Sequence, residues 1–334
     1  MYDESVLERS QTGLRAQNRG RGGDVTRRSL LAAVGAFAIQ AQQKVGPPPH
    51  EKGPRVFLDF DQIELDAMYT QVVYAPNAVE VQQRYSSNSE LTRARLGAPR
   101  RVSYGPSEIE KLDVFRTPRA KAPVQVFIHG GAWRAGTAKD YCFPADLFVA
   151  AGAHFIVPDF APVQDLGGSL LAMAQQARRA IQWVHDHAST FGGDAGRIFV
   201  TGWSSGAHLA GAALTQLTPG VVRGALLVSG MYDLKGPRLS ARSSYVKFDD
   251  VTEEALSPQR HMDKIQFPLT VAYGSLETPE FQRQSRDFTT ALKAARKPVE
   301  LIVGENYNHF EFIETLANPY GILGRAALRI MNLK

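Results

Sequence analysis

The sequence predicts an α/β fold with a doubly wound, mostly parallel sheet and helices on both faces. Apolar, β-branched runs alternate with helical segments from residue 123 to residue 316. The run 123–128 is the more continuously apolar one, as a central buried strand is, and no repeat period separates the alternating units. The chain has 334 residues, 44% of them hydrophobic, which is enough to bury a large core. One domain with added segments therefore accounts for most of the chain.

Residues 1–50 are expected to lie outside this domain, as an export signal and flexible linker. Thr26-Arg27-Arg28 precedes an apolar run from Leu30 to Ile39, and Pro47-Pro48-Pro49 follows. A basic start and an apolar run of about ten residues are typical of a signal peptide, whereas a membrane span needs about 20. The paired arginines resemble a twin-arginine signal, which predicts an exported, periplasmic protein. The alternative is a cytoplasmic protein with a disordered tail.

Residues 51–334 are expected to form the single domain. Its first part, residues 55–97, is read as short helices laid over the active site. Alternating polar and apolar positions predict strands at 101–104 and 112–115, paired antiparallel. Later apolar runs predict strands at 124–128, 154–158, 198–201, 225–229, 269–273 and 299–303. Periodic or small-residue segments predict helices at 140–151, 169–187, 207–214, 280–296 and 310–316. The polar stretch 232–262 is expected as an insertion over the active site.

The most informative motif is Gly202-Trp203-Ser204-Ser205-Gly206, a G-x-S-x-G pattern between a predicted strand and a predicted helix. Glycines let the backbone reverse tightly there, so that the Ser204 hydroxyl projects from a strained turn. A serine in this context is a candidate nucleophile. In an ordinary turn the same pattern carries little meaning, so its partners decide the interpretation.

An oxyanion-binding loop is predicted at His129-Gly130-Gly131-Ala132-Trp133, which follows the strand 124–128. Adjacent glycines allow backbone N–H groups to converge on one point, as an anionic tetrahedral oxygen requires. The candidate donors are Gly130, Gly131 and Ala132, with Ser205 supplying another. His129 is expected to anchor the loop by hydrogen bonding.

A serine hydroxyl needs a base, and His309 is the best placed of the eight histidines because it follows the last predicted strand. Two acids compete to orient it. Glu277 follows the strand 269–273 and Asp233 follows the strand before it. Both positions lie at the carboxyl ends of strands, where open α/β sheets place their sites. Either acid gives the chain order serine, acid, histidine.

A substrate pocket is predicted from aromatic residues near these motifs. They are Trp133, Trp203, Tyr232, Phe310 and Tyr307. Such a pocket favours an aryl or otherwise flat substrate; the alternative is that most of these side chains pack in the core.

Composition excludes several classes of protein and site. The net charge of +5 is mild, and no basic stripe interleaved with aromatics indicates nucleic-acid binding. The single Cys142 excludes an intrachain disulfide. His185 and His187 have no third ligand at a suitable spacing, so no metal is predicted, and no cofactor is expected. The chain is not expected to be an integral membrane protein, and a homo-oligomer is left open.

Taken together, these motifs resemble the α/β-hydrolase superfamily, and its esterase and kynurenine-formamidase-like branch in particular. The loop His129–Trp133 is similar to the formamidase loop His-Gly-Gly-x-Trp, and Gly202-Trp203-Ser204-Ser205-Gly206 and Ser229–Leu234 are similar to segments of that branch. The resemblance spans about residues 60–320. It implies Ser204 as nucleophile, His309 as base and Glu277 at the acid position, where aspartate is commoner.

The sequence therefore predicts a serine hydrolase that cleaves a small or aryl carboxylic ester through an acyl-enzyme. Hydrolysis of an aryl formamide or another amide is the alternative, because the same residues serve both reactions. A third hypothesis is a non-catalytic protein that uses this fold to bind a ligand.

Overall fold

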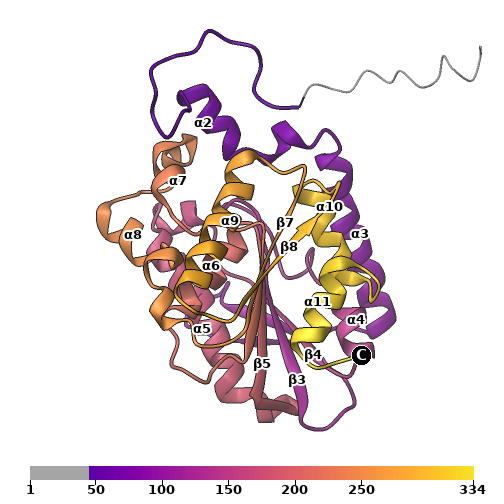
Figure 1. Cartoon of the computed structure of the whole chain (residues 1–334). Helices are drawn as coiled ribbons and strands as arrows, with labels where there is room; N and C mark the ends of the chain where they lie inside the picture. The colour runs from indigo at the N-terminus through magenta and orange to yellow at the C-terminus, as the bar shows by residue number, and fades with distance from the viewer. Residues whose placement is uncertain (1–44) are drawn as a thin grey trace, which may run out of the picture. The chain divides into compact units, whose positions relative to one another are not determined.

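An eight-stranded sheet organises residues 45–334, which are the residues that the computed structural model describes (Figure 1). Its strands are β1 (Arg100–Ser103), β2 (Lys111–Phe115), β3 (Ala122–Ile128), β4 (His154–Pro158), β5 (Gly193–Trp203), β6 (Gly224–Val228), β7 (Leu269–Gly274) and β8 (Val299–Gly304). Their order is β1-β2-β4-β3-β5-β6-β7-β8. The pairs that β2 makes with β1 and β4 are antiparallel, and the other five pairs are parallel. This is the predicted doubly wound sheet.

Helices cover both faces of the sheet (Figure 1). On one face lie α5 (Leu170–His187), α6 (Ser205–Leu214) and α9 (Pro279–Ala294), and on the other lie α3 (Ala78–Leu96), α4 (Ala145–Ala150), α10 (His309–Glu314) and α11 (Ile322–Ile330). Shorter α-helices are α2 (Gln62–Met68), α7 (Lys235–Leu239) and α8 (Asp250–Ala255). The 3-10 turns are η1 (Gln71–Tyr74), η2 (Val163–Leu166), η3 (Ala188–Phe191), η4 (Ala241–Ser244), η5 (Pro258–Arg260), η6 (Met262–Lys264) and η7 (Thr315–Ala317).

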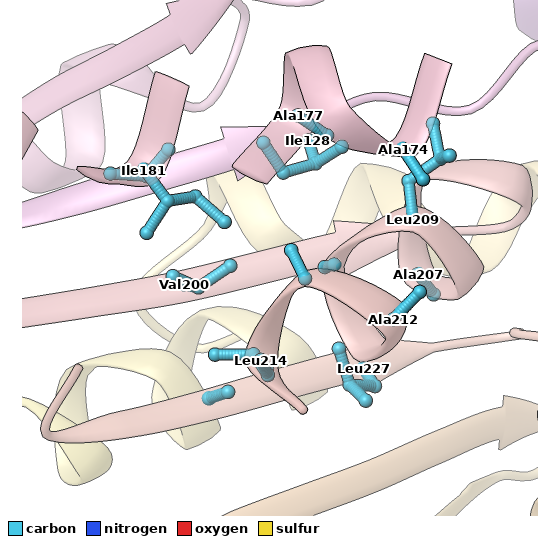
Figure 2. Close-up of a cluster of buried hydrophobic side chains, with 14 of the residues drawn as sticks. Ile128, Ala174, Ala177, Ile181, Val200, Ala207, Leu209, Ala212, Leu214 and Leu227 are labelled. Atoms are coloured by element: carbon cyan, nitrogen blue, oxygen red, sulfur yellow. The ribbon is translucent and has the colours of Figure 1, made fainter. Parts of the chain in front are cut away.

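Small side chains let α5 and α6 pack closely over the centre of the sheet (Figure 2). Ala174 and Ala177 of α5 belong to the same buried cluster as Ala207 of α6, together with Val200 of β5 and Leu227 of β6. The buried residues of α5 recur every three or four positions, which gives the helix one apolar face. The helix that follows the predicted nucleophile is thus fixed against the core on all sides.

The topology brings the predicted functional loops to one edge of the sheet. Strands β3, β5, β6, β7 and β8 are mutually parallel, so their carboxyl ends lie together. In register, Gly202 lies between Ile128 and Leu227, and Gly274 lies opposite Gly304. The loops after these five strands therefore converge, as expected for a site in an open α/β sheet.

The structure differs from the sequence expectations in several elements. Residues 137–143 form turns, and α4 begins only after Pro144, which has no N–H to continue a helix from the preceding turn. Residues 78–96 form one long helix instead of several short ones. Helix α11 was not predicted; it packs its apolar face on the sheet after the expected closing helix.

Residues 45–50, which the sequence assigns to the linker, contact the domain. Gly46 N–H donates to the Val73 carbonyl (3.1 Å), and His50 Nε2 lies 2.8 Å from Asp61 Oδ2. The compact unit accordingly begins at Val45. The predicted export signal lies in residues 1–44, outside the described residues. Within residues 45–334, no helix combines the length and the apolar character that a membrane crossing requires.

Candidate active site

Ser204 lies in the turn between β5 and α6 with φ 57° and ψ −127°, a conformation that L-residues rarely adopt. The Ser204 N–H donates to the Val228 carbonyl (2.8 Å), which ties the turn to the neighbouring strand. Both flanking glycines are required sterically. A Cβ at Gly202 would lie 2.6 Å from the Gly206 carbonyl oxygen, and one at Gly206 would overlap the carbonyl of Ile128. The turn is therefore strained and closely packed, and it presents the serine hydroxyl.

Three side chains from separate loops form a continuous hydrogen-bonded chain. Ser204 Oγ lies 2.9 Å from His309 Nε2, and His309 Nδ1 lies 3.0 Å from Glu277 Oε2. All three residues are buried. With Nδ1–H donated to the carboxylate, Nε2 is free to accept the serine proton. This is the arrangement that activates a serine hydroxyl.

The competing acid, Asp233, lies elsewhere. Its carboxylate accepts from the Lys235 N–H (2.8 Å) and lies 3.3 Å from Arg260 Nη2. Its own N–H donates to Gln284 (2.9 Å). The hydrogen bonds of Asp233 thus stabilise the loop at the start of the insertion. Glu277 is the acid that the structure brings to His309.

The Glu277 carboxylate is held by two further donors. Ser229 Oγ–H and Gly274 N–H both donate to Oε1, each at 2.6 Å. A buried carboxylate needs such partners because burial removes its hydration. Ser229 was not predicted as a functional residue. The sequence could have indicated it, because Ser229 directly follows β6 and so lies at the same edge of the sheet as Ser204.

The loop after β3 presents backbone donors beside Ser204. Gly131, Ala132 and Trp133 all have positive φ, and the N–H groups of Arg134 and Ala135 turn back onto the Gly131 carbonyl. Within residues 45–334, the N–H groups of Gly131 and Ala132 donate to no hydrogen-bond acceptor. The Ser205 N–H begins α6 and has no partner inside the helix. Gly130, the third predicted donor of this loop, is closely packed, since a Cβ there would lie 2.7 Å from the Trp203 ring.

Two other histidines near the site serve packing. His129 is stacked between Tyr141 and Phe160, and its Nδ1–H donates to the Gly130 carbonyl (2.8 Å). Burial lowers the pKa of His129. His208 accepts the Trp133 indole N–H (3.2 Å) and donates to the Leu256 carbonyl (2.9 Å). Burial lowers the pKa of His208 to about 4, so its ring is neutral at pH 7.

His185 and His187, the histidines considered for a metal site, make other contacts. His185 lies against Asp186 (2.9 Å) on an exposed face, and His187 stacks on Trp183. Within residues 45–334, no group of three or more potential ligands surrounds a common point.

A pocket of about 440 Å³ opens over Ser204 and His309. Its floor includes Gly131, Ala132 and Trp203, and Phe310 forms part of its wall. Arg134, Ala135 and Tyr141 also line the pocket, and most of the remaining lining comes from the two segments expected to cover the site. Helix α2, η1 and the turn between them contribute Asp66, Tyr69, Thr70, Gln71 and Val72. The insertion contributes Ser240, Ala241, Arg242, Ser244 and Tyr245.

Two of the aromatic residues predicted for the pocket lie in the core instead. Trp133 is 1% exposed and its indole N–H is used by His208. Tyr232 is fully buried and stacks on Phe288 with ring centroids 4.4 Å apart. Tyr307 packs on Phe312 outside the pocket. The aromatic lining is supplied by Trp203 and Phe310 as predicted, and by Tyr69, Tyr141 and Tyr245, which were not predicted.

The N-terminal segment also fastens the two loops that carry the acid and the histidine. Thr278 Oγ–H donates to the Met68 carbonyl (2.7 Å), next to Glu277. Tyr85 O–H donates to the Phe310 carbonyl (2.6 Å), next to His309. This segment was predicted to lie over the site. In the structure it also holds the loops that carry Glu277 and His309.

Comparisons with known proteins show the family to which the chain belongs. A kynurenine formamidase of Danio rerio is 30% identical over 73% of this chain and 86% of its own length, and one of Salmo salar is 32% identical over 69% and 81%. The chain belongs to the α/β-hydrolase superfamily, in its esterase and formamidase branch. The BD-FAE family model matches residues 112–222, from β2 to the turn before β6. Esterase LipQ of Mycobacterium tuberculosis is 30% identical over 58% of this chain and 52% of its own length.

Solved structures show the same fold. A structure described as a thioesterase, from Silicibacter sp. TM1040, superposes with a TM-score of 0.71 at 24% identity and covers 79% of this chain and 98% of its own. Esterase LipW of Mycobacterium marinum gives a TM-score of 0.62 at 17% identity, over 79% of this chain and 90% of its own. In this α/β hydrolase the order along the chain is Ser204, Glu277, His309, which matches the order that G-x-S-x-G hydrolases of this sheet type use.

Proposed function

We propose that this α/β hydrolase is a serine carboxylesterase that cleaves small or aryl esters, with Ser204, His309 and Glu277 as its catalytic triad. The observation that carries the proposal is the hydrogen-bonded chain of 2.9 and 3.0 Å that links these residues at the floor of the pocket. The similarity to named esterases supports an ester as the substrate.

In the proposed acylation step, His309 Nε2 takes the Ser204 proton as Oγ attacks the ester carbonyl carbon. The negative charge passes to the carbonyl oxygen, and the N–H groups of Gly131, Ala132 and Ser205 stabilise it. Collapse of this intermediate breaks the bond to the alkoxy oxygen, which takes the proton from His309 and leaves as an alcohol. Glu277 keeps the imidazole in the required tautomer and stabilises its protonated form.

In the deacylation step, water enters from the pocket. His309 removes one proton from the water, and the remaining hydroxide attacks the acyl carbon. Breakdown returns the proton to Ser204 Oγ and releases the carboxylic acid. One ester and one water are consumed, one alcohol and one acid are formed, and no cofactor is needed.

The direct test is Ser204→Ala, assayed on p-nitrophenyl acetate. We expect turnover to fall at least about 10⁴-fold, because the nucleophile and its base act as a unit. A fluorophosphonate probe should label the wild-type protein and fail to label the variant, while circular dichroism shows that the fold is retained. Near-wild-type turnover, or an unlabelled wild-type protein, would overturn the proposal and favour a ligand-binding role.

Arylformamidase activity is the second candidate, and the named kynurenine formamidases among the relatives favour it. The same residues would attack a formyl carbonyl and release an aryl amine. Comparing kcat/KM for N-formylkynurenine with that for short aryl esters separates the two activities. We expect the esters to be the better substrates; a preference for the formamide of tenfold or more would reverse the assignment.

A further inference from the structure

Two arginines line the pocket without an acidic partner among residues 45–334, and the proposed chemistry uses neither. Arg242, in η4, is 7% exposed. Its Nη2–H donates to the Tyr69 carbonyl (2.9 Å) and its Nη1–H to Tyr245 Oη (3.2 Å). The guanidinium also lies 4.9 Å above the Trp133 ring. Both hydrogen-bond acceptors are neutral.

No carboxylate within residues 45–334 forms an ion pair with Arg242, and its buried Nε–H has no acceptor there. The pocket contains one carboxylate, that of Asp66, which already accepts from the Ala241 N–H (2.6 Å) and from Gln62 (2.8 Å). A buried cation without a counter-charge is costly, because its hydration is lost and nothing replaces it. The lining therefore has an unmatched positive charge.

Arg134 adds a second positive charge to the same pocket. It belongs to the loop that presents the backbone donors, and its guanidinium lies 4.7 Å above the Tyr245 ring. Arg134 is exposed and also has no ion-pair partner within the described residues. Tyr245 thus connects the two arginines, contacting one through its ring and the other through its hydroxyl.

We propose that Arg242, assisted by Arg134, forms a subsite for a carboxylate group of the substrate. The substrate would then be an ester or amide that carries a separate carboxylate within reach of the pocket. A guanidinium binds a carboxylate through two parallel N–H bonds, and it fixes the orientation of the ligand as well as binding it. This inference rests on the proposed function, because it places the subsite in the pocket of Ser204.

Matched ester pairs test the subsite on the unaltered protein. Mono-p-nitrophenyl glutarate and p-nitrophenyl pentanoate share one leaving group and differ by a carboxylate on the acyl side. 4-Acetoxybenzoate and 4-acetoxybenzamide share one acyl group and differ by a carboxylate on the leaving group. We expect the charged member of at least one pair to have a kcat/KM about 30-fold higher than its neutral partner. A hydrogen-bonded pair of opposite charges typically contributes this much. Equal or lower kcat/KM for the charged members of both pairs would overturn the proposal.

Arg242→Gln separates recognition from a structural role. We expect it to lower kcat/KM for the preferred charged ester by about 30-fold and for its neutral partner far less, while Arg242→Lys recovers part of the loss. Equal losses on both members of the pair would make Arg242 a structural residue and overturn the subsite. Arg238→Gln is the matched control, because Arg238 lies in the same insertion but pairs with Asp250 and Glu253. If the proposed function itself fails, neutral esters are not hydrolysed at all and Ser204 takes no label, which is a different result.

Discussion

At the residue scale, Glu277 shows why a buried carboxylate can serve as the acid. Ser229 and Gly274 both donate to one oxygen, which leaves the other directed at His309. The carboxylate therefore has a single orientation, and so has the imidazole that it binds. Glutamate is one methylene longer than the commoner aspartate, and these two donors fix that longer side chain in place.

Glu277→Gln should lower kcat on p-nitrophenyl acetate by about 10⁴-fold. The amide N–H of glutamine would donate to His309 Nδ1, so that Nε2 carries the proton and cannot accept one from Ser204. Steady-state kinetics measures the loss. Asp233→Asn is the matched control and should keep kcat within about twofold. Equal losses in the two variants would contradict the assignment of the acid.

His208 gives a pH dependence of stability with a defined sign. Its folded pKa of about 4 lies below the unfolded value of 6.5, so between these pH values the unfolded chain binds a proton that the folded chain does not. The free energy of unfolding should fall as the pH falls from 6.5 to 4, by about 2 kcal/mol between pH 7 and pH 5 from this residue alone. Well above pH 6.5, His208 is neutral in both the folded and the unfolded chain and no longer makes stability depend on pH.

Urea denaturation of the wild type and of His208→Gln at pH 7 and pH 5 measures this contribution. Other groups titrate over the same range, so the quantity of interest is the difference between the two proteins. We expect the variant to lose about 2 kcal/mol less than the wild type on acidification. The same pH dependence in both would show that His208 is not buried as a neutral group.

At the element scale, α2, η1 and α3 act as a clamp on the two loops that carry Glu277 and His309, the proposed acid and base. Thr278 is tied to α2 through the Met68 carbonyl, and α3 reaches the histidine loop through Tyr85 and Asn77. Asn77 accepts from Asn308, the N-cap of α10. The positions of Glu277 and His309 thus depend on residues about 200 positions earlier in the chain.

Tyr85→Phe should reduce the free energy of unfolding by about 1–3 kcal/mol, because the buried Phe310 carbonyl loses its donor. The ring would keep its contacts with Phe143 and Trp203. With the loop loosened, we expect kcat to fall about three- to tenfold while KM changes little. Denaturation and steady-state kinetics check both effects. Tyr320→Phe, at an exposed tyrosine, should change neither, and an unaltered Tyr85→Phe protein would show that the clamp is unimportant.

The strands of the sheet could be predicted within a few residues because buried parallel strands are continuous apolar runs. Beta-strand β4 was predicted with its observed bounds. Helix α11 was not predicted, since it is short and lies beyond the predicted closing helix at 310–316.

In the site, the G-x-S-x-G turn indicated Ser204 through local backbone chemistry alone. Arg242 could not be predicted, because its importance depends on an absent acid partner and on Tyr69, 173 residues away.

The burial of individual aromatic side chains was equally beyond the sequence. Trp133 and Trp203 both lie within glycine-containing motifs, yet only Trp203 lines the pocket. Trp133 turns inward because the positive φ of its loop directs its indole to His208. A pattern of residue types does not distinguish these two directions, since both leave an aromatic ring mostly buried.

At the scale of the whole molecule, residues 45–334 contain every group that the proposed reaction uses. We propose that residues 1–44, which carry the predicted signal, serve in export. The single cysteine, Cys142, is buried, and the chain has no disulfide to form in an oxidising compartment. Nothing in the chemistry of the domain requires it to fold after export, which suits a signal for transport of folded proteins.

Replacing Arg27 and Arg28 by lysine should abolish export and leave the protein with the cytoplasmic fraction. The substitution keeps the positive charge, so a loss of export would show that the arginine pair itself is read, as in a twin-arginine signal. Cell fractionation of the native host, followed by N-terminal sequencing of the exported protein, measures the effect. The small-x-small pattern Ala36-Phe37-Ala38 is the expected cleavage signal, so the wild-type mature chain should begin after residue 38. The variant should retain Met1 but hydrolyse p-nitrophenyl acetate with unchanged kcat/KM. Arg19→Lys with Arg21→Lys, in the same leader, should be exported normally. A wild-type protein that keeps Met1 in the cytoplasm would rule out the leader as a signal.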